Sequence, residues 1–313
     1  MSVEKITKYL NKIDFVLILI MALTTTLYIY NLGELPFGPD ESTYSSQAAI
    51  LAGHDESREN FIPYSRSATN FQVQQWITSL FFEKYGISEY VARIPTVIMG
   101  ILSVLLIYMI ARELFSRRMA LLSALFTGLN GYSLHFNRQI NLDTPLVFFM
   151  ILSMLLIVKW RRTKKNWYFY LFLISVILAT MSKVIIIIPL AIIAFIYLYI
   201  EKDHENGIKM LFKPLSILIM VAGLLYAVYF IVTIVGIDDY IKTLSYATDR
   251  ESKITSTFYL KTVVLLLGYA FPLIALAGLV RSLRDRSEGD ILCIVWFASI
   301  LLFFTYYPLQ GYN

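Results

Sequence analysis

Charged residues are scarce in this sequence. Only 16% of its 313 residues are Asp, Glu, Lys or Arg, whereas 58% are hydrophobic and the mean hydropathy is +0.64. A soluble domain of this length needs far more charge to cover its surface. The composition therefore excludes an ordinary soluble protein and predicts a polytopic membrane protein.

Cysteine and histidine are scarce as well. The single cysteine, Cys293, excludes a disulfide framework and a cysteine-rich metal site. The three histidines, His54, His135 and His204, are scattered along the chain, which argues against an all-histidine metal site. The sequence also has no glycine-rich loop of the kind that cradles the phosphates of a nucleotide sugar. We therefore predict no cofactor and no metal site.

Apolar runs of membrane-spanning length are abundant instead. They predict an all-α polytopic fold with about nine transmembrane helices, in a single domain that covers residues 1–313. The expected spans are 13–30, 91–111, 119–136, 145–159, 167–182, 184–200, 214–236, 258–280 and 291–308.

The net charge of +5 raises the alternative of a nucleic-acid-binding protein. With a cytoplasmic N-terminus, however, most Lys and Arg residues fall on the inner loops, and the short "KWRRTKK" loop is the densest in positive charge. This is the pattern of the positive-inside rule. Lysines precede the first span, and no small-residue cleavage site follows it, so we expect an uncleaved anchor. The charge thus predicts a cell-membrane protein that binds no nucleic acid.

The first outer loop, residues 31–90, is too long and too aromatic for a simple connection. Residues 41–52 have a weaker helical pattern, with Asp40 or Ser42 available as the N-cap. A clearer helical pattern in "QVQQWITSLFFEKYG" predicts a helix in the membrane interface, with its apolar face on Val73, Trp76, Ile77, Leu80 and Phe81. A second polar outer loop is expected at residues 237–257.

Five of the ionisable residues on the outer side stand out as candidates for a site: Asp40, Glu41, Arg138, Asp143 and Lys183. Each has a structural alternative. Asp40 and Glu41 could be solvated loop carboxylates, and Asp143 could cap a helix that has Pro145 in its first turn. Arg138 could pair with Asp143 or anchor the protein to a lipid phosphate.

Lys183 could extend to the lipid headgroups. The preceding span, 167–182, would however be only about 24 Å long, shorter than the hydrocarbon core of about 30 Å. Lys183 would then lie below the headgroups, where an ammonium needs a partner or a wet cavity.

Four motifs occur in a defined order. They are "PDES" at 39–42, "GISEYVARIP" at 86–95, "RELFSRRM" at 112–119 and "RQINLD" at 138–143. In these motifs the chain resembles the superfamily of dolichyl-phosphate-mannose protein mannosyltransferases and aminoarabinose transferases, which are membrane glycosyltransferases of the GT-C fold. The resemblance covers about residues 30–200.

The resemblance implies roles for several residues. Asp40 matches the catalytic base and Glu41 its acidic neighbour, while Asp143 matches the acidic residue of the second motif. Arg138 and Lys183 match basic positions near the lipid-linked phosphate. The chain departs from the family where many members have Lys-Pro-Pro-Leu before the interfacial helix. Asn70 stands at that lysine position here, and Arg66 is the candidate replacement.

Members of this superfamily continue beyond the equivalent of residue 313, so the resemblance also implies a short or truncated form.

The residues themselves suggest a compatible reaction. A site outside the cytoplasm has no supply of nucleotide sugars, whereas a polyprenyl-phosphate-type lipid can present a sugar at the membrane surface. Arg138 and Lys183 could bind its phosphate, and Asp40 could take the proton of an acceptor hydroxyl on a protein, lipid or glycan. A retaining mechanism needs a second carboxylate on the opposite face of the sugar, which adjacent Glu41 would not supply. We therefore expect inversion at the anomeric carbon.

Three alternatives remain open. A transporter would place charges at the middle of broken helices in repeated halves, and neither is seen here. A non-catalytic membrane scaffold would fit the loss of the family lysine at Asn70. A metal-dependent relative of the oligosaccharyltransferases would need more carboxylates, which Asp238, Asp239 or Asp249 could supply.

Overall fold

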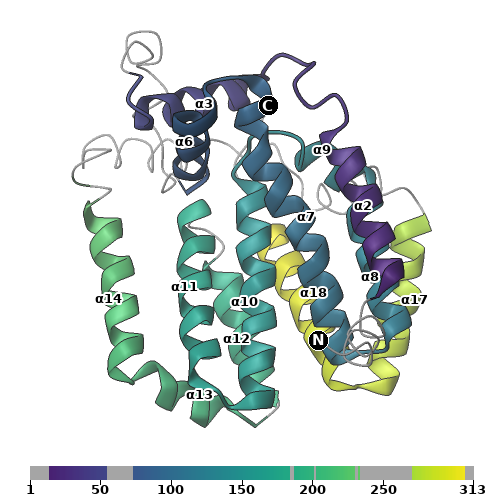
Figure 1. Cartoon of the computed structure of the whole chain (residues 1–313). Helices are drawn as coiled ribbons and strands as arrows, with labels where there is room; N and C mark the ends of the chain where they lie inside the picture. Colours follow the sequence, from purple (N-terminus) through teal and green to yellow (C-terminus); the bar gives the residue numbers. More distant parts are fainter. Residues whose placement is uncertain are drawn as a thin grey trace, which may run out of the picture.

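Helices form all the regular secondary structure in the part of the chain that the structure describes (Figure 1). The structure is a computed structural model, and it describes residues 14–54, 73–183, 187–200, 202–229, 232 and 270–306. The helices are α2 (Phe15–Ile29), α3 (Pro39–Leu51), α6 (Val73–Tyr85), α7 (Glu89–Leu114), α8 (Arg117–Leu129), α9 (Gly131–Phe136), α10 (Asp143–Thr163), α11 (Asn166–Ser182), α12 (Ile187–Ile200), α13 (His204–Leu211), α14 (Pro214–Tyr229), α17 (Ala270–Asp285) and α18 (Glu288–Tyr306).

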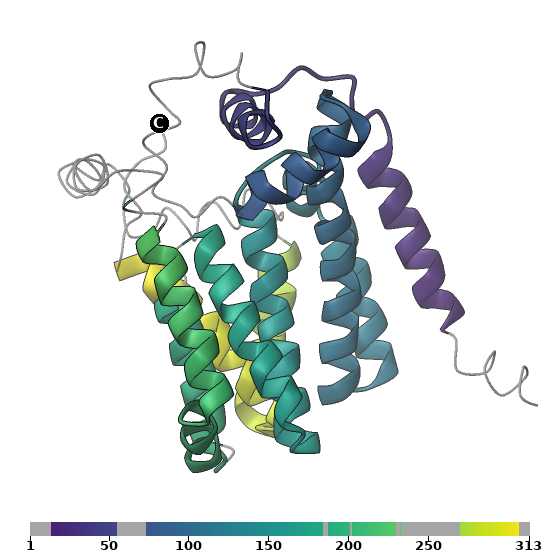
Figure 2. The ribbon, with the colours of Figure 1, turned by 60° about the vertical axis from the view of Figure 1, so that its left-hand side comes forward.

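Long helices stand side by side in a bundle, and the short helices α3, α6 and α9 lie at its upper end in Figure 1. Figure 2 shows the same bundle from another side, with α3 and α6 above it. Successive long helices run in opposite directions. The segments before α3 and between α9 and α10 therefore meet at the upper end, while the connections 115–116 and 164–165 lie at the lower end.

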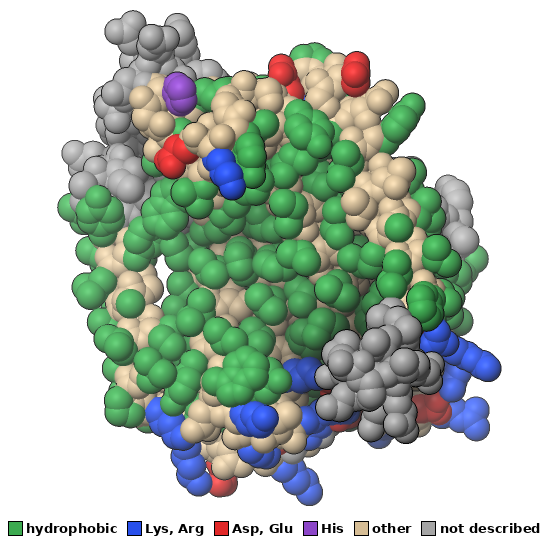
Figure 3. All heavy atoms as spheres, viewed as in Figure 1, with side chains coloured by type: hydrophobic (Ala, Val, Ile, Leu, Met, Phe, Trp, Pro, Cys, Tyr) green, Lys and Arg blue, Asp and Glu red, His purple; other side chains and the backbone are tan. Residues whose placement is uncertain are grey.

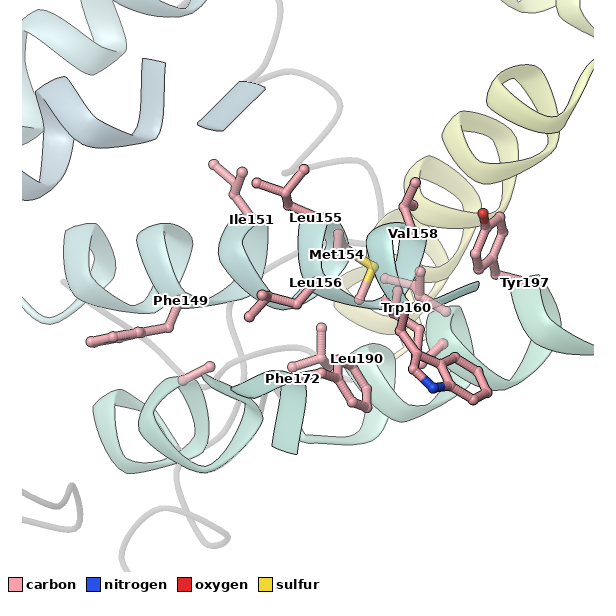
Figure 4. Close-up of a cluster of buried hydrophobic side chains, with 14 of the residues drawn as sticks. Phe149, Ile151, Met154, Leu155, Leu156, Val158, Trp160, Phe172, Leu190 and Tyr197 are labelled. Atoms are coloured by element: carbon pink, nitrogen blue, oxygen red, sulfur yellow. The ribbon is translucent and has the colours of Figure 1, made fainter. Parts of the chain in front are cut away.

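The core of the bundle lies around α10, which packs against α7 and α11 (Figure 4). Met154, Ile157 and Val158 of α10 are fully buried, and the ring of Trp160 meets that of Phe169 edge-on at 5.0 Å. Because lipid tails are as apolar as these side chains, such a core is stabilised in a membrane by close packing.

Apolar side chains cover the middle of the face seen in Figure 3, and Lys and Arg side chains gather at its lower end. Two described helices, α7 and α10, are long and apolar enough to cross a membrane. The bent pair α13 and α14, which meet at 67°, adds a third if it is one span, and α2, α11 and α12 are shorter apolar helices. The prediction of an all-α membrane protein is confirmed, but the number of nine spans is not.

One of the predicted spans is divided in the structure, and another is mostly untested. The expected span 119–136 is two helices, α8 and α9, which are separated at Asn130. The Asn130 side chain accepts a hydrogen bond from the backbone N–H of Ser133 at 2.8 Å, so it caps α9 and starts a new helix there. Most of the expected span 258–280 lies outside the described residues.

The predicted helix in the first outer loop is present as α6, but its polar side faces inward. Gln74, Gln75 and Thr78 are buried, whereas Trp76 and Leu80 are exposed. Amide and hydroxyl groups hydrogen-bond to one another on the buried side, and the exposed apolar side chains suit contact with lipid.

A network of ion pairs closes the lower end of the bundle. Arg162 binds Glu113 at the end of α7 and Glu288 at the start of α18, and Arg161 also binds Glu288. Lys164 binds Asp203 at 2.5 Å. These pairs join helices that are far apart in the sequence, at the end opposite to α3 and α6.

Candidate active site

The stretch "PDES" begins helix α3. Gly38 is the N-cap residue in an extended conformation, and Pro39 occupies the first turn, where its missing N–H costs nothing. Asp40 and Glu41 follow in the same turn, where negative charge is favoured by the helix dipole. The expectation that Asp40 or Ser42 would be the N-cap is wrong, because the Glu41 carboxylate reaches back to the Gly38 N–H at 3.1 Å instead.

The two adjacent carboxylates have different surroundings. Glu41 is 6% exposed, whereas Asp40 is exposed on the helix surface. Consecutive residues of a helix point about 100° apart, so one can be buried while the other faces outward. The two carboxylates are therefore adjacent in the sequence but occupy different environments in the fold, one buried and one exposed.

Glu41 forms a bidentate ion pair with Arg93 of α7. Arg93 Nε lies 2.8 Å from Glu41 Oε1, and Arg93 Nη2 lies 2.9 Å from Oε2. Glu41 Oε1 also accepts the backbone N–H of Ile140 at 3.1 Å. Three segments distant in sequence therefore meet at this one carboxylate.

Arg93 also binds backbone carbonyl oxygens of the segment that precedes α3. It donates to the carbonyl oxygens of Leu32 and Leu35 at 2.7 and 2.9 Å, and to that of Pro36 at 3.3 Å. Its guanidinium lies over the Phe37 ring, 5.3 Å from the centroid. No role for Arg93 is predicted from the sequence, although an arginine inside an apolar helix indicates that it has a buried partner.

The turn between α9 and α10 carries Arg138 and is held by hydrogen bonds on both sides. Asn137 donates to the Tyr28 hydroxyl of α2 at 3.0 Å and accepts from Thr144 Oγ1 at 3.1 Å. The Asn141 side chain accepts the Thr144 N–H at 2.8 Å. Asn141 thus accepts the hydrogen bond at the start of α10, and the alternative that Asp143 caps this helix is wrong.

Asp143 instead binds Lys183, which follows the last residue of α11. Lys183 Nζ lies 2.5 Å from Asp143 Oδ1, and the two side chains are 23% and 41% exposed. This pairing supplies the partner that the short fifth span led us to expect for Lys183. Among the described contacts Arg138 is not paired with Asp143, and its guanidinium donates to the carbonyl oxygen of Tyr30 at the end of α2.

An amide bridge fixes α3 against α6. Gln75 Nε2 donates to Gln47 Oε1 at 2.8 Å, and both side chains are buried. Gln74 Nε2 in turn donates to Thr78 and to Thr96 of α7, at 3.1 and 3.0 Å. The helix that carries Asp40 is therefore tied to α6 and, through Arg93, to α7.

The structure thus brings the sequence-derived residues to one end of the bundle in two contacting groups. Glu41 contacts the turn that carries Arg138, and Asp143 contacts Lys183. Several candidates lie outside the described residues, namely Arg66, Asn70, Asp238, Asp239 and Asp249. Within the described ranges, no group of three or more His, Cys, Asp or Glu side chains could hold a metal ion.

The arrangement can act on a phosphate-bearing substrate. Asp40 lies in the first turn of α3, Arg138 lies in the turn before α10, and Lys183 follows α11. These elements meet at the same end of the bundle, so the two cations and the exposed Asp40 carboxylate lie at that end. Cations at such a position can bind an anionic headgroup, and an exposed carboxylate can accept a proton.

Comparison with protein families gives a match over residues 72–230 to the family described as dolichyl-phosphate-mannose-protein mannosyltransferase. A relative in Aquifex aeolicus (strain VF5), an uncharacterized protein, is 27% identical over 304 residues, which cover 93% of this chain and 58% of the relative. This chain therefore spans less than two thirds of that relative.

Two solved structures have a similar fold. The crystal structure of ArnT from Cupriavidus metallidurans in the apo state gives a TM-score of 0.72 at 17% identity, covering 95% of this chain and 55% of that chain. The structure of the same protein bound to undecaprenyl phosphate gives 0.71 at 18% identity, covering 92% and 55%. At these identities the likeness shows a shared fold.

Proposed function

Because this chain belongs to the dolichyl-phosphate-mannose-protein mannosyltransferase family, we propose that it is a glycosyltransferase that moves a sugar from a polyprenyl-phosphate-type lipid to an acceptor hydroxyl. The fold that it shares with ArnT, which was solved with undecaprenyl phosphate bound, supports a lipid donor. The acceptor is a hydroxyl of a protein, lipid or glycan.

The division of the carboxylate pair is the observation that carries the proposal. Glu41 is buried and neutralised by Arg93, so it has no access to substrate. Asp40 remains exposed one position earlier, at the end of the bundle where Arg138 and Lys183 also lie. A general base must reach the proton that it removes, and of the two carboxylates Asp40 alone meets that condition.

The reaction then proceeds in one displacement. Asp40 accepts the proton of the acceptor hydroxyl, whose oxygen forms a bond to the anomeric carbon. The bond from that carbon to the phosphate oxygen breaks, and its electron pair stays on the phosphate. Arg138 and Lys183 stabilise the charge that develops there. With one base and one displacement, the anomeric configuration is inverted.

The bound phosphate would compete with Asp143 for Lys183. In the structure Asp143 holds the ammonium at 2.5 Å, and both side chains are partly exposed. An incoming phosphate can therefore reach the Lys183 ammonium from the surface, and it can displace Asp143 or share the ammonium with it. We propose that the site lies on the non-cytoplasmic face, because the basic lower end of the bundle fits the cytoplasmic side.

Substitution of Asp40 by asparagine tests the proposal. Asn keeps the size of the side chain but cannot accept the proton, so transfer in proteoliposomes should fall about 10²–10⁴-fold while donor binding persists. Glu34→Gln, a change of another exposed carboxylate in the same outer segment, is the matched control and should retain activity. Transfer by folded Asp40→Asn within a few-fold of the unsubstituted protein would contradict the assignment.

A further inference from the structure

We propose that Arg93 is a positioning residue for Asp40, acting through Glu41 and the segment before α3. The inference rests on the proposed function, because it gives Arg93 a task in sugar transfer. Arg93 itself is 3% exposed and lies on α7, so it does not contact a substrate at the membrane surface.

All five N–H donors of the Arg93 guanidinium are used. Nε binds Glu41 Oε1, Nη1 binds the carbonyl oxygens of Leu32 and Leu35, and Nη2 binds Glu41 Oε2 and the carbonyl oxygen of Pro36. A planar fork with five donors fits this set of acceptors, whereas the ammonium of lysine has three donors on a flexible stem. The site therefore requires arginine for its geometry as well as for its charge.

The contacts of Arg93 determine where α3 begins. Its three carbonyl partners lie in the connection from α2, and its carboxylate partner lies in the first turn of α3. Both sides of Gly38 are therefore fixed to α7, and Asp40 is two residues further along the same turn. A shift of the guanidinium would move Asp40 with the start of the helix.

The turn that carries Arg138 is held in another way. It contacts Glu41 through the Ile140 N–H, but Asn137 and Asn141 also fasten it to α2 and α10. Loss of Arg93 should therefore disturb Asp40 more than the cations that bind the donor. This difference predicts a separable kinetic effect.

A buried ion pair is a poor device for stability alone, because removing two charges from water offsets much of their attraction. An apolar pair of the same volume could stabilise the fold equally well, but it would not fix the backbone by directional hydrogen bonds. The ion pair therefore favours a role for Arg93 in placing the start of α3.

Arg93→Lys tests the proposal in the full-length protein with a polyprenyl-phosphate sugar as donor. A displacement of about 1 Å in a catalytic group can lower the rate about 10²-fold. We expect kcat to fall by about that factor while the KM for the lipid donor stays within about threefold. Arg112→Lys, at the exposed lower end of the same helix, is the control and should keep both constants.

A double substitution separates positioning from general destabilisation. If Arg93 acts through Asp40, adding Arg93→Lys to Asp40→Asn should lower the residual rate by less than threefold. Independent effects would multiply instead, and a full further 10²-fold loss would overturn the proposal. A kcat of Arg93→Lys within threefold of the unsubstituted protein would overturn it as well.

A measurement without activity distinguishes failure of this inference from failure of the proposed function. Spin labels on Glu34→Cys and Glu83→Cys, in a Cys293→Ser background, report the distance between the segment before α3 and the end of α6. Arg93→Lys should broaden their distance distribution, and Arg112→Lys should not. An unchanged distribution refutes the positioning of this segment by Arg93. A lack of transfer by the unsubstituted protein, with a broadened distribution in the variant, refutes only the proposed sugar transfer.

Discussion

Replacing Lys183 by glutamine should weaken donor binding while leaving the fold intact. Lys183 binds Asp143 at 2.5 Å, but the two side chains are 23% and 41% exposed. Pairs with this degree of exposure typically contribute about 0–1 kcal/mol to stability because water screens them. Loss of the pair should therefore shift the thermal midpoint only slightly.

The expected loss in donor binding is larger. A hydrogen bond from a charged group to the phosphate is worth about 1.5–3 kcal/mol. At about 1.4 kcal/mol for each factor of ten, that loss raises the KM for the lipid donor roughly 10- to 150-fold. If Lys183 only extends to lipid headgroups, both stability and KM should stay nearly constant.

The assay is transfer from a synthetic polyprenyl-phosphate sugar in proteoliposomes, combined with thermal unfolding of the purified variants. Arg138→Gln should raise the donor KM in the same range, because it removes the other cation that we assign to the phosphate. Lys165→Gln, at the opposite end of α11, is the control for loss of a positive charge. A donor KM within twofold of the unsubstituted value for folded Lys183→Gln would refute the assignment.

The remaining predictions concern topology and the lower end of the bundle. In a Cys293→Ser background, an impermeant maleimide should label Glu34→Cys from outside intact cells but not Thr163→Cys; labelling of residue 163 would reverse the topology. Asp14 caps α2 and binds Arg117 at 2.8 and 2.9 Å, and this hydrogen bonding is the main reason that the pKa of Asp14 lies below its usual 3.8. A carboxyl whose pKa is lower in the folded than in the unfolded state stabilises the fold at any pH above its unfolded-state pKa. This stabilisation is lost as the pH falls through the folded-state pKa. Asp14→Asn should therefore lower the thermal midpoint at pH 7, and the difference should shrink as the pH falls below 3.8 towards the folded-state pKa; a constant difference across that range would contradict this reading.

The sequence predicts the local features of this fold well, because they depend on residues close together. The period of apolar residues anticipates α6, and the expected span 91–111 lies within α7. The break at Asn130 is also local, but the mostly apolar composition of residues 119–136 conceals it. One side-chain cap, with the backbone N–H of Ser133, is enough to divide that segment.

The site is harder to predict, since its residues are joined across long stretches of sequence. Asp143 and Lys183 are 40 positions apart, and Glu41 and Arg93 are 52 positions apart. Family resemblance selects Glu41 as an acidic neighbour of the base, but only the packing of α3 on α7 shows that it is buried against Arg93. The acidic pair in the sequence therefore does not reveal which member is accessible.

The ion pairs at the lower end have a consequence for the order of events during synthesis. Arg162 of α10 and its partner Glu288 of α18 are 126 positions apart. At a synthesis rate of about 5–20 residues per second, Arg162 is synthesised roughly 6–25 s before that carboxylate. During this interval Glu113, made earlier, already offers Arg162 a partner. The synthesis of α18 then supplies a second carboxylate, Glu288, which joins α18 to α10 through Arg161 and Arg162.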